Sequence, residues 1–223
     1  MTLLSPDKKT IILHVPRTGG TGRRAALRKK GYRVLREGSF HCRLHDLWRV
    51  HDICPETAER VVIFVRDPAQ RELSMWNWAR EQGFSGDQMK FPRMHDDPNG
   101  YLSDPRCGPA QWYERYFRQG YYNHDTEVTY DEHVNKHGYH YWCRFDGEPV
   151  MGNVDVVWLE CQDAYLSKLI GESVEVPMLN GAKRPKPTSL WSDDSRELLG
   201  QMYSWYYKTL TNIRKSVAEA ANV

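Results

Sequence analysis

The amino-acid sequence predicts an α/β fold of three layers, in which a central parallel sheet lies between layers of helices. Two short apolar runs rich in β-branched residues, 11–15 and 61–65, are expected to form buried strands. Each is followed by the start signals of a helix, and a third strand and helix are expected in 154–170. Strands that alternate with helices favour a parallel sheet covered on both faces.

The expected elements follow one another along residues 1–223, which are treated as one domain. Strands are expected at 11–15, 33–35, 61–65 and 154–159, and helices at about 22–30, 68–80, 162–170 and 193–221. Thr21 is expected to cap the first helix, and Asp67 the second, with Pro68 as its first residue. The segment from about 83 to 148 is polar, aromatic and rich in His, and is expected to be an irregular insertion of loops and short hairpins.

The composition is ordinary for a globular protein and disfavours some classes of partner. The chain has 31 Lys and Arg against 29 Asp and Glu, and a net charge of +2 gives no reason to expect a nucleic-acid partner. No segment is apolar for long enough to cross a membrane, and no apolar leader follows the polar start. The five cysteines form no CxxC pair, and their odd number fits reduced thiols, so a cytoplasmic protein is expected.

The segment Pro16-Arg17-Thr18-Gly19-Gly20-Thr21 joins the first expected strand to the first expected helix. Glycines let a ligand approach the backbone closely, and a helix N-terminus carries partial positive charge to which Arg17 adds a full charge. The segment is therefore suited to a phosphate group, although a simple glycine turn is an equal alternative. It lacks the GxxxxGK[ST] pattern of an ordinary phosphate-binding kinase loop.

A second motif follows in residues 61–78, VVIFVRDPAQRELSMWNW. Arg66 stands at the carboxyl end of the expected strand. On the expected helix, Arg71, Ser74 and Trp78 share one face because they are three and four residues apart. Arg66 and Ser74 can then converge on one phosphate, and the alternative is a surface arginine beside a helix cap.

Together these motifs resemble the PAPS-dependent sulfotransferase superfamily, most closely its carbohydrate, heparan-sulfate-type branch. Its members carry a P-K-T-G-G-T-like loop after the first strand and a later R-[DN]-P-x-x-R-x-x-S motif. The resemblance implies a P-loop-like α/β/α fold and transfer of a sulfuryl group from PAPS to an acceptor hydroxyl, with no metal. It covers both ends of the fold, including residues 154–171, but not the middle of the chain.

The resemblance also implies roles for individual residues. The 5′-phosphosulfate of PAPS is expected to lie on the loop, and its 3′-phosphate on Arg66 and Ser74. Lys183 and Arg184 resemble the basic loop that closes over the nucleotide. The loop residues concerned are Arg17, Thr18, Gly19, Gly20, Thr21 and Gly22. Arg17 departs from the family's usual Lys: it can neutralise the leaving group but cannot donate a proton to it.

A histidine is the expected base for the acceptor hydroxyl, because its pKa lies near neutrality. His41 lies in the interval where carbohydrate-type members often place that residue, and His45 is the second candidate. The acceptor is expected to be a carbohydrate or a small molecule. Aromatic residues between 112 and 142 can form a platform for it, although packing is the simpler role for most of them.

Three alternatives remain open at this stage. A metal site is the minority interpretation of two groups of residues whose spacing matches no closed zinc pattern: His41, Cys42, His45, His51 and Cys54, and His133, His137, His140 and Cys143. An ATP-dependent phosphotransferase would require a Lys in the loop and a carboxylate that binds Mg²⁺, and neither is evident in the sequence. A non-catalytic module that binds PAP would keep Arg66 and Ser74 without depending on His41. The sequence does not indicate an oligomeric state.

Overall fold

The computed structural model describes residues 2–15, 17–35, 58–81, 95–104, 144–145, 148–149, 154–179 and 190–202. Contacts divide the chain into two compact units, which are described separately below. The first comprises residues 1–66 and 139–181, and the second comprises residues 67–138 and 182–223. The expectation of a single domain stays a prediction.

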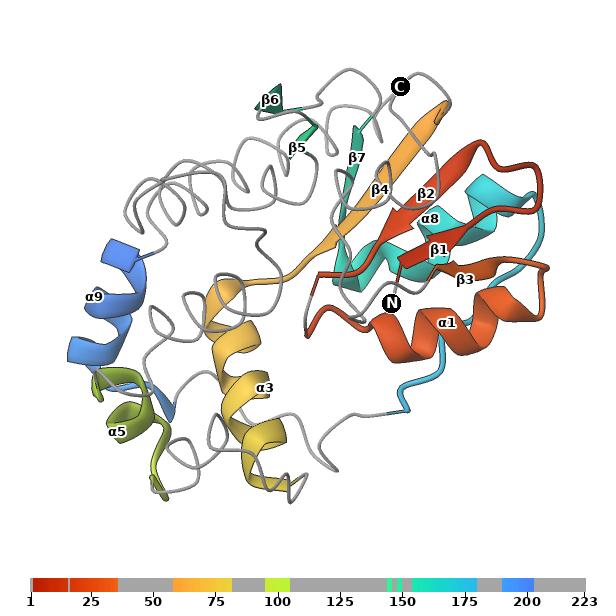
Figure 1. The fold of residues 1–223 in the computed structure, drawn as a ribbon. Helices are drawn as coiled ribbons and strands as arrows, with labels where there is room; N and C mark the ends of the chain where they lie inside the picture. The colour runs from red at the N-terminus through yellow and green to blue at the C-terminus, as the bar shows by residue number, and fades with distance from the viewer. Residues whose placement is uncertain are drawn as a thin grey trace. The chain divides into compact units, whose positions relative to one another are not determined.

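The first unit is built on a five-stranded sheet in the order β3-β1-β2-β4-β7 (Figure 1). Its strands are β1 (Thr2–Leu4), β2 (Thr10–Leu13), β3 (Arg33–Leu35), β4 (Arg60–Val65) and β7 (Val154–Trp158). β4 pairs in parallel with both β2 and β7, whereas β1 is antiparallel to both of its neighbours. Four strands therefore run in one direction and β1 runs against them. The prediction of an α/β fold is confirmed, but the sheet is mixed rather than purely parallel.

Strand β1 was not expected, because the polar residues after it make the start of the chain look like an unstructured end. Those residues form the hairpin loop between β1 and β2. The Ser5 N–H donates to the Thr10 carbonyl at 2.9 Å, and the Asp7 carboxylate accepts hydrogen bonds from the Ser5 hydroxyl and the Lys9 N–H. Leu3 is buried and pairs with Ile12, so this three-residue strand contributes to the core.

Two helices of the first unit, α1 (Gly20–Arg28) and α8 (Gln162–Ile170), pack on the same face of the sheet. Leu27 of α1 and Leu166 of α8 join one apolar cluster with side chains from alternating strand positions, among them Val62 and Phe64. The opposite face is also buried, as Ile63 shows. Among the described residues, no helix of this unit covers that second face, so the third layer stays a prediction.

The later elements of this unit agree closely with expectation. β7 ends one residue earlier than expected, a single 3₁₀ turn, η4 (Leu159–Cys161), follows it, and α8 has the expected bounds. A small antiparallel pair, β5 (Arg144–Phe145) and β6 (Glu148–Pro149), lies in and just after the segment that was expected to contain short hairpins.

The described part of the second unit consists of helices α3 (Pro68–Glu81), α5 (Pro98–Ser103) and α9 (Asp193–Met202). The prediction that Asp67 caps α3 is confirmed, because its carboxylate accepts the Gln70 N–H at 3.0 Å. Two tryptophan side chains connect separate segments of this unit by hydrogen bonds. The Trp76 indole donates to the His95 carbonyl, and the Trp191 indole donates to the Ala69 carbonyl, both at 3.2 Å.

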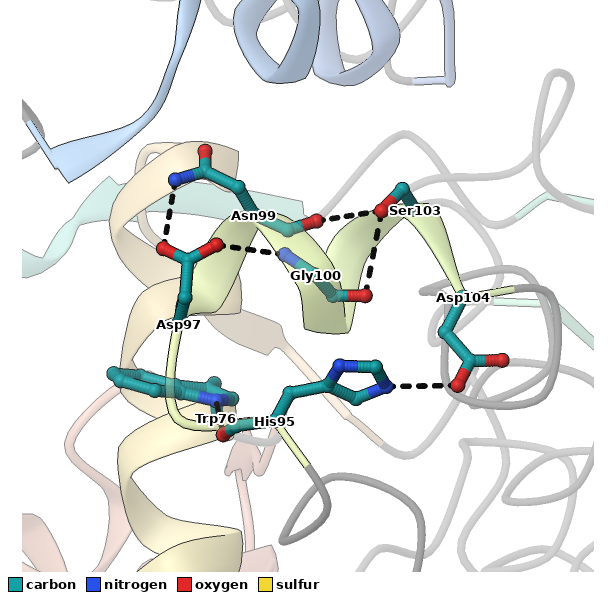
Figure 2. Close-up of polar contacts among 7 residues, drawn as sticks. All are labelled: Trp76, His95, Asp97, Asn99, Gly100, Ser103 and Asp104. Atoms are coloured by element: carbon teal, nitrogen blue, oxygen red, sulfur yellow. Dashed lines mark hydrogen bonds and ion pairs between the residues drawn. The ribbon is translucent and has the colours of Figure 1, made fainter.

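Helix α5 is not among the expected helices, because its segment is polar and lacks periodic apolar residues. Its start nevertheless repeats the signal that predicted α3: Asp97 is the N-cap and Pro98 the first helical residue. The Asp97 carboxylate accepts the Gly100 N–H at 3.0 Å, as Figure 2 shows. Asn99 then connects α5 to the start of α9, because its amide donates to the Leu190 carbonyl and accepts the Ser192 N–H. None of the helices in the described part of the chain is long and apolar enough to cross a membrane.

Candidate functional site

The turn between β2 and α1 contains the sequence motif and opens directly onto the N-terminus of α1. Gly19 is the N-cap, in the left-handed conformation with φ 79°, and no side chain caps the helix. The first turn of α1 contains no acidic residue. The first N–H groups of an α-helix find no acceptor within the helix and attract anions. Thr21 lies inside this first turn, so the prediction that it caps the helix is wrong.

The glycines of the turn let three other parts of the first unit approach it closely. A Cβ atom on Gly20 would lie 2.1 Å from the His14 imidazole, and one on Gly22 would lie 2.1 Å from the Pro177 carbonyl oxygen. A Cβ on Gly19 would lie 2.9 Å from Leu159, in addition to the strain of its positive φ. The glycines are therefore required by the packing of the chain around the turn.

Arg17 adopts the left-handed conformation with φ 63°, which costs a non-glycine residue roughly 1–2 kcal/mol. Its side chain is half-buried. Only Lys8 shares this backbone conformation among the non-glycine residues that the structure describes. Such conformations persist where the surrounding structure enforces them, and they concentrate at functional sites.

Thr18 is fully buried, and its hydroxyl holds the turn together. The hydroxyl donates to the Val15 carbonyl at 2.8 Å and accepts a hydrogen bond from Arg23 Nη2 at 3.1 Å. Because the side chain is used inside the turn, the contribution of Thr18 to a ligand would come from its backbone.

Arg23 lies one helical turn beyond the N-cap and is 1% exposed. Its Nη1 donates to Gln162 Oε1 at 3.0 Å, and its guanidinium lies over the Phe64 ring, 3.9 Å from the centroid. Loss of hydration lowers the pKa of Arg23 to about 9, so the side chain is charged at neutral pH. Sequence reasoning missed this residue; the available signal was its four-residue spacing from Leu27, which places both on the buried face of α1.

The two residues of the second motif lie on different units. Arg66 follows β4 in the first unit and is half-buried, whereas Ser74 lies on α3 in the second unit. Their convergence on one phosphate therefore stays a prediction. Arg71 is buried and pairs with Glu72, with Nη2 and Oε1 3.2 Å apart. The Glu72 side chain is therefore buried beside this arginine and does not lie on a solvated helix face.

The segment that follows α8 returns to α1. Val174 and Val176 are tied to α8, since their N–H groups donate to Ser167 Oγ and Asp163 Oδ1. The chain then places the Pro177 carbonyl against Gly22, in the first turn of α1. Lys183 and Arg184 follow a few residues later, but they lie outside the described residues. So do His41, His45, the two groups of His and Cys, and the aromatic residues between 112 and 142.

A histidine–carboxylate pair in the second unit was also missed. His95 and Asp104 flank the two ends of α5, and their Nε2 and Oδ2 atoms are 2.7 Å apart (Figure 2). Asp104 is almost completely buried and His95 about a quarter exposed. The imidazole packs against Gly100, where a Cβ atom would lie 2.9 Å from Nδ1. The pair joins the residues on either side of α5. The two residues are nine positions apart in the sequence, so no local pattern predicts their contact.

Metal binding finds no support in the part of the chain that the structure describes, where no group of three or more His, Cys, Asp or Glu side chains could hold an ion. Comparisons of the chain with protein-family models, with curated proteins and with solved structures found no match.

Proposed function

We propose that this chain is a PAPS-dependent sulfotransferase that transfers a sulfuryl group to an acceptor hydroxyl. The observation that carries the proposal is the β2–α1 turn. It combines a left-handed glycine cap, a helix N-terminus without acidic residues, and arginines at positions 17 and 23. Phosphate groups bind where helix N-termini and cationic side chains meet. The sequence motifs around Arg66 and Ser74 support a donor that carries a 3′-phosphate.

In the proposed reaction, the acceptor oxygen forms a bond to sulfur while the bond between sulfur and the 5′-phosphate oxygen breaks. The acceptor proton passes to His41, and PAP leaves. Arg17 and the backbone of residues 18–22 stabilise the negative charge that develops on the leaving phosphate. Arg66 and Ser74 would fix the 3′-phosphate, and Lys183 and Arg184 would close over the nucleotide.

The proposed acceptor is a carbohydrate or a small molecule with a free hydroxyl. We place the reaction in the cytoplasm, because the scattered cysteines suit a reducing compartment. Cys161, at the start of α8, is an exposed free thiol, which is consistent with that choice.

The first test compares nucleotides that differ in the 3′-phosphate. PAP is expected to raise the melting temperature without any metal, and more than ADP does at the same concentration, because a ligand stabilises the folded state in proportion to its affinity. Stabilisation by ATP with Mg²⁺ and none by PAP would contradict the proposal and favour a phosphotransferase.

The second test measures transfer of labelled sulfate from PAPS to a panel of sugars, phenols and alcohols. With an accepted substrate, His41→Ala is expected to lower kcat by roughly 10²–10⁴-fold, because it removes the base. His45→Ala is the matched control and should retain most of the activity. Full turnover by His41→Ala would show that His41 is not the base, and PAP binding without any transfer would indicate a non-catalytic module.

A further inference from the structure

Arg23 is a buried cation whose hydrogen-bond partners are neutral. Nη1 donates to the Gln162 amide oxygen and Nη2 to the Thr18 hydroxyl, while the face of the guanidinium lies against Phe64. Among the described residues, no carboxylate pairs with Arg23, and burial is the cause of its lowered pKa. Removing a charge from water without an opposite charge is energetically unfavourable. A buried hydrophobic residue of similar size would avoid this cost.

The charge of Arg23 lies directly behind the turn that would receive an anion. Nη2 holds Thr18, and Nη1 lies 3.3 Å from the position where a Cβ atom on Gly19 would stand. The guanidinium thus contacts the residue before the N-cap and lies close beside the N-cap itself. A positive charge in this position adds to the field of the α1 N-terminus, and water screens it little because it is buried.

Arg23 also determines the shape of the turn. Its two terminal nitrogens connect Thr18 to Gln162, the first residue of α8, so the turn is tied to the β7–α8 junction. Leu159 packs against Gly19 from the same junction. The planar fork of an arginine reaches both partners at once, which the single ammonium of a lysine does not do.

We propose that Arg23 is the positioning residue of this anion site, a buried cation that holds the Thr18–Gly19 turn and whose charge a ligand phosphate at the α1 N-terminus compensates. The ligand class is a nucleotide or other molecule with a phosphate or phosphosulfate group, and its identity as PAPS rests on the proposed function. Arg23 acts through the turn and through its charge, without touching the ligand.

The experiment compares Arg23→Met with the wild type, using pyrophosphate and PAP as probes in calorimetric titrations. Methionine removes the charge and keeps an unbranched side chain. We expect the dissociation constants of both probes to rise about tenfold or more. In the absence of ligand, the free energy of unfolding in urea should be unchanged or higher, because replacing a buried charged group by an apolar one is often neutral or stabilising.

The matched control is Arg28→Met, which removes the same charge from the same helix at an exposed position. It should bind both probes within twofold of the wild type. A folded Arg23→Met variant that does the same would overturn the proposal. If the wild type binds pyrophosphate but not PAP, the sulfotransferase proposal fails while Arg23 is still tested by pyrophosphate. If it binds neither probe, both proposals fail.

Arg23→Lys provides a second variant in case Arg23→Met does not fold. A buried lysine titrates at a much lower pH than an exposed one, whereas arginine keeps its proton more firmly. We therefore expect the pyrophosphate affinity of Arg23→Lys to fall as the pH rises from 6 to 8, relative to the wild type at each pH. Parallel pH profiles for the two proteins would show that the charge at position 23 does not act on the ligand.

Discussion

At the scale of single residues, close approaches of the backbone decide what the first turn of α1 tolerates. Gly22 is the clearest case, because its neighbour is the Pro177 carbonyl, a backbone group that cannot rotate away as the end of a side chain can. Gly200 offers the opposite situation: it also lies in a helix, α9, but an added Cβ would meet no atom within 4 Å. Replacing each of these glycines by alanine therefore distinguishes the effect of packing on stability from the effect of helix propensity.

Gly22→Ala is expected to destabilise the protein by about 1–3 kcal/mol, because the added methyl group forces the segment around Pro177 away from α1. Gly200→Ala should stabilise it by about 0.5–1 kcal/mol, since alanine is the better helix former. Urea unfolding followed by far-ultraviolet circular dichroism measures both. Equal effects at the two positions would show that the contact with Pro177 does not constrain the helix.

Arg23 and Glu72 show what local sequence patterns do not reveal at this scale. Charged side chains on helices are usually solvated, so the sequence predicts neither residue to lie in the site or in the core. Each is buried because of partners on other segments or on its own helix: Gln162 and Phe64 for Arg23, and Arg71 for Glu72. The glycines of the sequence predict the turn that forms the candidate site, but they do not predict the contacts of Arg23 that hold this turn.

At the scale of secondary-structure elements, α5 depends on the contacts at its two ends. A helix of six residues has little stability of its own, because nucleation of a helix is unfavourable. Asp97 caps its start, and the pair of His95 with Asp104 joins the residues on either side of it. The Trp76 indole of α3 donates a hydrogen bond to the His95 carbonyl, so His95 also connects α5 to α3.

Asp104→Asn is expected to destabilise the second unit by about 1–3 kcal/mol, because it weakens a buried hydrogen bond to His95 and leaves polar groups poorly paired. Asp96→Asn is the control. Asp96 lies a few residues before Asp104, and its carboxylate pairs with Arg80. This carboxylate is 95% exposed, so its loss should cost less than about 0.5 kcal/mol of folding free energy. Unfolding followed by tryptophan fluorescence compares the two, and equal losses would contradict a structural role for the His95–Asp104 pair.

The elements that the sequence predicted correctly carry strong local signals. The apolar run of β4, the Asp67–Pro68 start of α3 and the pattern of α8 each lie within one short stretch. β1 carries no such signal, because three residues are too few for a periodic pattern and only pairing with β2 and β3 makes them a strand. α5 carries a start signal at Asp97 and Pro98, but the polar sequence around it gives no apolar pattern that would predict a helix.

At the scale of the whole molecule, each unit brings together residues that are far apart in the chain. In the first unit, Arg23 joins Thr18, Phe64 and Gln162, which stand on a turn, a strand and a helix from three parts of the sequence. The apolar cluster that includes Phe64 draws on β1, β2, β4 and β7 and on both α1 and α8. The candidate site therefore depends on the whole sheet unit, and local patterns predict its place but not its supporting contacts.

This architecture predicts where the first unit is most stable. β4 pairs with a parallel neighbour on each side, and its residues 61–65 are completely buried, whereas β3 pairs only with β1 among the described strands and exposes Arg33. Amide hydrogen exchange is expected to be slowest at Val62, Ile63 and Phe64, where it reports unfolding of the unit as a whole, and at least tenfold faster at Val34, which can open locally. Exchange measured by nuclear magnetic resonance without ligand tests this. Equal protection of β3 and β4 would show that the sheet opens as one piece and that β3 is not its weak end.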